Sequence, residues 1–186
     1  AEPETRGLVA LMLLQHSRRH ARVDEHGDLV LLEDQDRARW DQDMIDEGLA
    51  TLDAAVAMRR PGPYQVQAAI AAIHARAPRP ENTDWPEIAT LYRVLKAMSP
   101  SPVIELNRAV AVAMADGPDA GLALIEPLAD ELYPKLAGYY EDQATGTSTA
   151  RIEKMPIAVG ASTVPLERIM PEKTTAVPKT SALHST

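Results

Sequence analysis

The sequence predicts an all-α fold of antiparallel helical hairpins, followed by an irregular C-terminal tail. Apolar residues recur every three or four positions along most of the first 132 residues, which is the helical period. Segments rich in proline and glycine interrupt these stretches, as expected of loops between helices. Aromatic residues make up 4% of the chain and Phe is absent, whereas β-sandwiches normally carry more aromatic and β-branched residues.

Three helices are predicted in the first half of the chain, over residues 4–23, about 37–58 and 64–77. Leu8, Leu11 and Met12 are expected on the buried stripe of the first helix. Residues 23–28 predict a turn, and the apolar run 29–32 is expected to be either a short strand or, preferably, an extended piece that covers the helices. The apolar positions of the second helix begin at Trp40, and the third should carry His74 as a core histidine.

Three further helices are predicted at about 85–98, 102–115 and 118–132. Asp84, with Glu87 three residues later, resembles a capping box. Ser101 is a typical N-cap because Pro102 follows at the first helical position. Serine, threonine and proline crowd the later part of the chain. We therefore expect a helical domain over residues 1–132 and a divergent, irregular or disordered tail over residues 133–186.

Composition and charge exclude several classes of protein. The formal net charge is −8 and no dense Lys/Arg run is present, so direct binding to nucleic acid or to an anionic membrane is not expected. No apolar run approaches the roughly 20 residues that span a bilayer. Cysteine is absent, which suits a cytoplasmic protein. The chain begins with Ala1 rather than Met, so we expect it to be a fragment of a longer protein.

A repeat signal lies in the second half of the helical region. Trp85 to Tyr92 matches the tetratricopeptide opening W-x2-L-G-x2-Y, with Ile88 and Ala89 in place of Leu and Gly. Ala89 would let the paired helix approach, while Trp85 and Tyr92 would fill gaps between helices. Replacing Trp85 by alanine is accordingly expected to cost roughly 3–5 kcal/mol. The next hairpin should turn at Gly117, with the small residues Ala109, Ala113 and Gly121 at the helix contact.

Longer blocks carry a resemblance to a known family. These blocks are Gly7-Leu8-Val9-Ala10-Leu11-Met12-Leu13-Leu14, Leu32-Glu33-Asp34-Gln35-Asp36-Arg37, Gly62-Pro63-Tyr64-Gln65, Thr83-Asp84-Trp85, and Ser101-Pro102-Val103 with Leu106-Asn107-Arg108-Ala109. In this order they resemble the tetratricopeptide-like C-terminal extension of extracytoplasmic-function sigma factors, over residues 4–128. That resemblance implies a right-handed α-solenoid. From about Glu131 the chain departs from the family's pattern.

The resemblance implies a regulatory role in bacterial transcription initiation. The domain would contact the sigma regions in cis, and through them RNA polymerase, or another protein; the sigma regions themselves are not in this sequence. The candidate interaction surface is Glu33, Asp34, Asp36, Arg37, Trp40, Asn107 and Arg108. Trp40 would anchor the junction, or it would have a buried structural role instead. An independent helical-repeat scaffold unrelated to transcription is the alternative function.

Metal and catalytic alternatives are weaker. His16 and His20 have the spacing of paired zinc ligands, but Ser17 stands where the HExxH motif has glutamate. Asp24, Glu25, His26 and Asp28 do not complete a calcium loop, and a hairpin turn explains them better. The clustered acids Glu33, Asp34, Asp36 and Asp41 are more simply helix caps than an acid–base pair. We therefore expect no enzyme activity, no metal and no cofactor.

Overall fold

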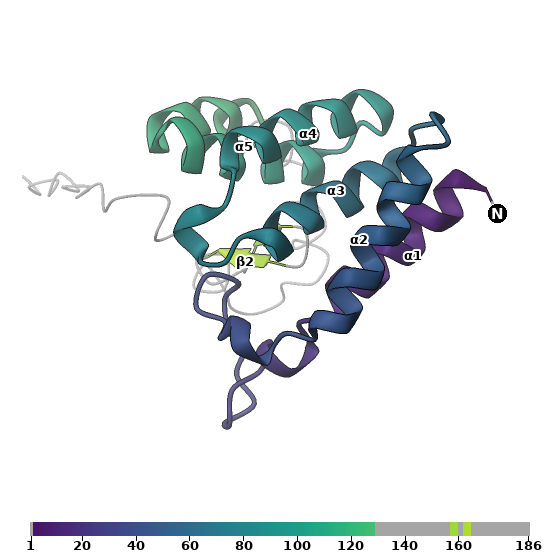
Figure 1. Cartoon of the computed structure of the whole chain (residues 1–186). Helices are drawn as coiled ribbons and strands as arrows, with labels where there is room; N and C mark the ends of the chain where they lie inside the picture. The colour runs from purple at the N-terminus through teal and green to yellow at the C-terminus, as the bar shows by residue number, and fades with distance from the viewer. Residues whose placement is uncertain (1, 129–156, 160–161, 165–186) are drawn as a thin grey trace, which may run out of the picture.

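The computed structural model describes residues 2–128, 157–159 and 162–164, and its body is helical (Figure 1). The helices are α1 (Pro3–His16), α2 (Gln42–Val56), α3 (Pro63–Arg76), α4 (Trp85–Met98), α5 (Pro102–Asp116) and a further helix over residues 118–128. Short 3-10 turns occur at Arg19–Ala21, Arg37–Arg39 and Pro80–Asn82. The predicted all-α fold is confirmed.

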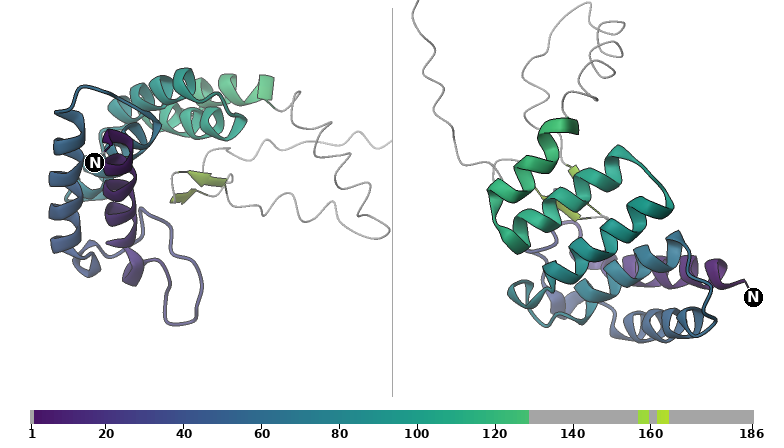
Figure 2. Two further views of the ribbon diagram at one scale, coloured as in Figure 1. Left: turned by 90° about the vertical axis from the view of Figure 1, so that its right-hand side faces the viewer. Right: turned by 90° about the horizontal axis from the view of Figure 1, so that it is seen from above.

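Two short strands follow in the part of the chain that was predicted to be irregular. β1 (Ile157–Val159) and β2 (Ser162–Val164) pair antiparallel. β1 lies against α5, and the two strands sit on the inner side of the bend formed by the helices (Figure 2). The remainder of the predicted tail lies outside the described residues, so the boundary at residue 132 stays a prediction.

The helices stack so that each packs against its neighbours in sequence, and α1 contacts both α2 and α3. α3 separates two apolar cores. Its Ala68 and Ala72 face the core shared with α1 and α2, whereas Val66 and Ile70 face the core shared with α4 and α5. An interior helix covered on two sides by successive neighbours is typical of stacked helical repeats.

The first helix differs from its prediction in length and in its buried face. α1 ends at His16 instead of Val23, because the Ser17 hydroxyl donates to the Leu14 carbonyl at 2.8 Å and Arg22 Nη2 donates to the Gln15 carbonyl at 2.7 Å. Its buried positions include Ala10 and Leu14, whereas Met12 is 62% exposed. The prediction was therefore wrong for Met12, whereas Leu8 and Leu11 are partly buried and Leu11 packs against the core. The buried face differs because α1 contacts both α2 and α3.

The second helix also begins later than predicted. α2 starts at Gln42 because Arg37–Arg39 forms a 3-10 turn and Trp40 and Asp41 are extended. This local conformation directs Trp40 into the first core, where it is 4% exposed. It also lets the Asp41 carboxylate accept a hydrogen bond from the Met44 amide at 3.1 Å, which caps α2.

Helix caps further along the chain follow the sequence signals. Asp84 accepts from the Glu87 amide at 3.0 Å, and Ser101 accepts from the Val103 amide at 3.3 Å. α3 has Gly62 at its N-cap, which offers no side chain. The Glu4 carboxylate of α1 supplies the acceptor instead, taking the Tyr64 amide at 3.0 Å. A side chain of α1 therefore caps the N-terminus of α3 at the contact between these two helices.

Small residues mark the closest helix contacts. A Cβ at Gly7 would lie 2.8 Å from the Gln65 backbone nitrogen, so α1 can approach α3 only with glycine there. A Cβ at Gly121 would lie 2.7 Å from the Ala109 carbonyl oxygen and would also meet Ala113. Gly117 has φ of 101°, a conformation that side chains disfavour, and it turns the chain between these helices. The predicted contact between α5 and the following helix is confirmed.

Gly121→Ala is expected to lower the free energy of unfolding by about 1–3 kcal/mol, because overpacking against a backbone carbonyl outweighs the better helix propensity of alanine. Urea denaturation followed by circular dichroism measures the change. In the Gly121→Ala background, Ala113→Gly should cost less than it does in the wild type, because it makes room for the new methyl group. Strictly additive losses in this double-mutant cycle would contradict the packing argument.

Candidate interaction surfaces

A groove of about 320 Å³ crosses α1, α3 and α5, with buried residues of α4 contributing to its lining. Its lining is mostly apolar and includes Leu11, Ile70, Val103, Gln15, Gln67 and Asn107. Because α1, α3 and α5 alternate along the chain, one continuous surface draws on three successive hairpins. We refer to it as the inter-hairpin groove.

Asn107 contributes a buried polar side chain to the lining of this groove. It is 6% exposed, and its Oδ1 is buried without a hydrogen-bond partner. Burial raises the pKa of the neighbouring Tyr92 to about 12, and a hydrogen bond from the Asn107 side chain partly opposes that shift. A buried carbonyl oxygen without a donor is costly, so Asn107 is suited to accept a hydrogen bond from a bound molecule.

Arg108 lies on a different side of α5 from Asn107. It donates to Glu105 through Nε at 3.0 Å and Nη2 at 2.7 Å, and Lys96 of α4 reaches the same carboxylate at 2.9 Å. The hydrogen bonds from Arg108, with support from Lys96, lower the pKa of Glu105. Arg108 lines a separate recess between α4 and α5, so the structure does not bring it together with Asn107.

The predicted block from Glu33 to Trp40 divides into outward and inward residues. Asp34 and Asp36 are exposed, and Asp36 caps the 3-10 turn by accepting from the Ala38 amide at 3.0 Å. Arg37 Nη1 donates to the carbonyls of His74 and Ala77, at 2.8 and 3.0 Å, which fixes the end of α3. Trp40 is buried, which matches the structural alternative; a partner contact by the exposed acids stays a prediction.

A cluster of arginines around Trp40 was missed in the sequence. The guanidinium carbon of Arg37 lies 4.4 Å from the Trp40 ring centroid and that of Arg18 lies 5.8 Å away, which are cation–π distances. Arg18 is only 5% exposed. Burial, followed by the charges of Arg22 and Arg37, lowers the pKa of Arg18 to about 10. In sequence, Arg18 resembles an ordinary cation at a helix C-terminus, and nothing local marks it as buried.

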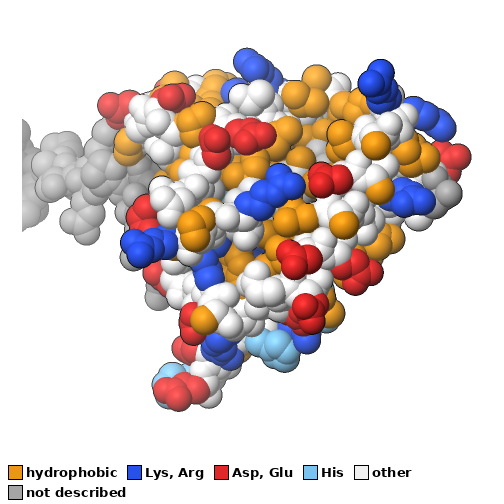
Figure 3. Space-filling view, viewed as in Figure 1, with side chains coloured by type: hydrophobic (Ala, Val, Ile, Leu, Met, Phe, Trp, Pro, Cys, Tyr) orange, Lys and Arg blue, Asp and Glu red, His pale blue; other side chains and the backbone are white. Residues whose placement is uncertain are grey.

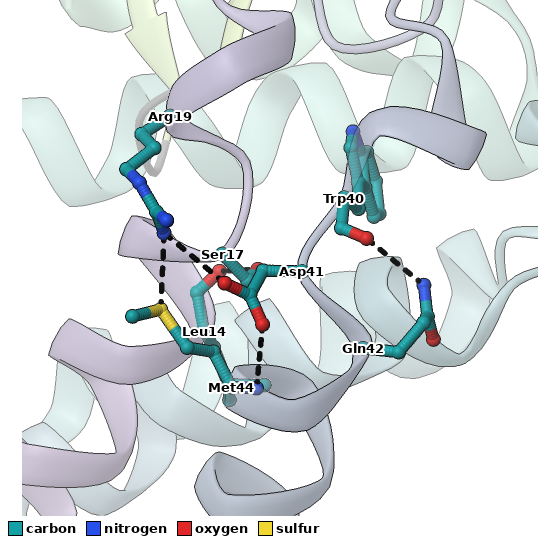
Figure 4. A network of polar contacts seen from close by, with 7 residues as sticks. All are labelled: Leu14, Ser17, Arg19, Trp40, Asp41, Gln42 and Met44. Atoms are coloured by element: carbon teal, nitrogen blue, oxygen red, sulfur yellow. Dashed lines mark hydrogen bonds and ion pairs between the residues drawn. The ribbon is translucent and has the colours of Figure 1, made fainter.

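Neighbouring polar contacts join the end of α1 to the start of α2 (Figure 4). The Arg19 guanidinium points toward the Asp41 carboxylate and the Met44 sulfur, both at 3.3 Å. The Asp41 amide donates to the Ser17 carbonyl at 2.9 Å. Asp41 therefore caps α2 and also links it to α1, which accounts for this acid without a catalytic role.

His74 lies beside the same arginines and packs edge-on against Trp85, with ring centroids 5.3 Å apart. Its side chain is partly buried rather than fully enclosed. Burial, followed by the charges of Arg18 and Arg37, lowers the pKa of His74 to about 3 from an ordinary 6.5. The folded chain therefore holds this imidazole neutral.

The protein is expected to lose stability as the pH falls from about 6.5 toward 3. Over that range the unfolded chain binds a proton at His74 that the folded chain does not, so the stabilisation is complete only above the unfolded pKa. Urea denaturation at pH 7 and pH 5 measures the loss. His74→Gln should lose less stability between these two pH values than the wild type; equal losses would contradict this role of His74.

The remaining predicted packing residues lie in the second core or against it. Tyr92 and Ala109 are buried, at 3% and 0% exposed, while Trp85, Ala89 and Ala113 are partly buried and pack against the core residues. The tetratricopeptide-like spacing therefore brings these side chains to the α4–α5 hairpin, as predicted.

The candidate metal ligands do not converge. α1 ends at His16, and a turn separates it from the 3-10 turn containing His20, so the two are not one helical turn apart on one helix. The Asp24 carboxylate accepts from the amides of His26 and Asp28 at 2.8 and 2.9 Å, and Val23 pairs with Leu29. The hairpin-turn interpretation is confirmed. Within residues 2–128, 157–159 and 162–164, no group of three or more His, Asp or Glu side chains is placed to hold a metal ion.

The surface charge is mixed. On the face seen in Figure 3, acidic and basic side chains alternate with apolar ones, without an extended basic field. Across the described part of the chain, no helix is both long and apolar enough to cross a membrane.

Comparisons with known proteins match parts of the sequence. Residues 1–56 match the model of a family of unknown function (DUF6596), and this segment ends at the last residue of α2. An uncharacterized protein of Rhizobium meliloti (strain 1021) is 60% identical over 140 residues, which are 75% of this chain and 32% of that protein. The chain thus spans about a third of the length of this relative. No solved structure matches this chain.

Proposed function

We propose that this chain is the C-terminal regulatory domain of a bacterial extracytoplasmic-function sigma factor. It modulates transcription initiation in the cytoplasm by contacting the sigma regions in cis, or a partner protein. The sequence blocks that resemble this family support the proposal, as does the stack of helical hairpins. The observation that carries it is the inter-hairpin groove, in which three alternating helices present one largely apolar surface whose polar residues include Asn107.

The chemistry of this groove suits a polypeptide. Leu11, Ile70 and Val103 offer apolar contact, and the Asn107 Oδ1 acceptor has no partner. A bound backbone would supply both apolar side chains and N–H donors, so one ligand would satisfy both features. Binding, rather than a reaction, is what we propose for this surface.

The length of the Rhizobium relative is consistent with a regulatory domain that forms one part of a longer protein. About two thirds of the Rhizobium protein lies outside the matched 140 residues. In this proposal the corresponding part of the whole protein carries the sigma regions, which contact promoter DNA and polymerase. The net charge of this chain, −8, is consistent with DNA being bound by another part of the whole protein.

Titration calorimetry of the chain against purified sigma regions of this class tests the proposal. We expect a one-to-one complex. Asn107→Ala should weaken it about fivefold, corresponding to roughly 1 kcal/mol for a lost hydrogen bond. Asn82→Ala, at an exposed position in a 3-10 turn, is the matched control and should leave the affinity unchanged.

Folding of both variants is checked by circular dichroism. Failure of the folded wild type to bind the sigma regions would remove the proposed function and favour the independent helical-repeat scaffold. If binding occurs, in vitro transcription with core polymerase and the sigma regions, with and without this chain, gives the sign of regulation.

A further inference from the structure

A second and larger groove, of about 780 Å³, runs along the side of α1 and includes the hairpin formed by residues 22–30. Its apolar lining includes Val9, Met12 and Leu29, which are 44%, 62% and 69% exposed. We call it the α1 groove. It is distinct from the inter-hairpin groove, although Gln15 contributes to both.

The α1 groove leaves one side of α1 uncovered within the described residues. α1 packs against α2 and α3 on its other sides, through positions such as Ala10 and Leu14. In stacked helical repeats the outer face of an end helix is normally polar, because it meets water. Here the outer face carries Val9 and Met12, spaced three residues apart, which is typical of a helix surface that packs against another helix.

The charged side chains that line this groove are all basic. They are Arg19 and Arg22, with His16 beside them, in a chain whose net charge is −8. Arg19 is paired with Asp41, whereas Arg22 donates through Nη2 to the backbone carbonyl and the side-chain oxygen of Gln15, at 2.7 and 3.1 Å, and has no ion pair with any described residue. The acids Asp24, Glu25 and Asp28 belong to the hairpin but do not line the groove.

We propose that the α1 groove is the docking site for an acidic amphipathic helix of another polypeptide segment. Apolar side chains of that helix would cover Val9, Met12 and Leu29, and its flanking carboxylates would pair with Arg22. The choice of the sigma regions as the source of this helix rests on the proposed function. The preference of the groove for an acidic amphipathic helix rests on its shape and charge, and does not depend on the proposed function.

Fluorescence anisotropy with two synthetic helical peptides tests the chemistry. One peptide has a leucine face flanked by glutamates, and the other has the same leucine face flanked by lysines. We expect the full chain to bind the glutamate peptide at least about tenfold more tightly, equivalent to roughly 1.4 kcal/mol. Added salt should reduce this preference, because the contacts between charged groups are screened.

Two groove variants and one matched control locate the binding. Met12→Glu and Arg22→Glu should each weaken the glutamate peptide about tenfold or more. Val56→Glu, at a 57% exposed apolar position of α2 outside the α1 groove, should leave its affinity unchanged. Equal affinity for both peptides, or binding that neither groove variant alters, would overturn the proposal.

The same variants separate this inference from the proposed function. If the glutamate peptide binds as expected but the sigma regions do not bind, the α1 groove stands and the proposed function fails. If the sigma regions bind and Met12→Glu and Arg22→Glu leave that binding unchanged, their helix does not occupy this groove and the inference fails. Light scattering tests whether a second copy of the chain occupies the α1 groove. If the wild type is a dimer that Met12→Glu dissociates, the groove mediates self-association, which would also overturn the proposal.

Discussion

Trp40→Ala is expected to lower the free energy of unfolding by about 3–5 kcal/mol, the usual cost of removing a buried aromatic side chain. Trp40 is 4% exposed and belongs to the core shared by α1, α2 and α3. Its loss would open a cavity and would also remove the ring that Arg18 and Arg37 contact. Arg18 would then be a buried cation without its aromatic partner, which adds to the destabilisation.

Urea denaturation followed by circular dichroism measures this change, with Trp85→Ala as the matched control. Trp85 is only partly buried, so its loss should be smaller, roughly 1.5–3 kcal/mol. The sequence pattern favoured Trp85 as the residue with the larger loss of stability. The structure instead predicts the larger loss for Trp40, because Trp40 is more deeply buried. A loss for Trp40→Ala no greater than that for Trp85→Ala would contradict this ordering.

Ile88→Ala is expected to cost about 2–5 kcal/mol, because Ile88 is fully buried at 0% exposed in the second core, among residues of α3, α4 and α5. Ile88→Val removes a single methylene and should cost about 0.5–1.5 kcal/mol. A graded response of this kind indicates tight packing, since a loosely packed core would tolerate both changes similarly.

Val94→Ala is the control on the same helix. Val94 is 38% exposed and lies outside the second core, so its truncation should cost much less than that of Ile88. Denaturation curves for the three variants, recorded under identical conditions, provide the comparison. Equal losses at Ile88 and Val94 would mean that α4 does not pack with the orientation described.

The two core substitutions also probe how the stack unfolds. Trp40 and Ile88 lie in different cores, and α3 contributes to both. Because α3 is shared, we expect either substitution to shift one cooperative transition. Repeat proteins can instead unfold one unit at a time when the contacts between neighbours are weak. Two separate transitions in Trp40→Ala would show such weak coupling.

The sequence by itself determined the features that depend on neighbouring residues. The caps at Asp84 and Ser101, the turn at Gly117 and the small residues that meet near Gly121 were all predicted and confirmed. Each of these signals acts within a few residues, or at the contact between two consecutive helices. Such signals mark where helices begin and end without information about residues distant in the sequence.

Only the tertiary structure decided which sides of the helices are covered. The sequence placed Met12 inward and did not mark Arg18 as buried, yet Met12 is exposed and Arg18 lies beside Trp40. α1 has apolar residues on more than one side, so its buried face depends on where α2 and α3 pack. The two grooves arise in the same way, because they combine side chains from segments that are distant in sequence, and periodicity within one helix carries no information about its neighbours.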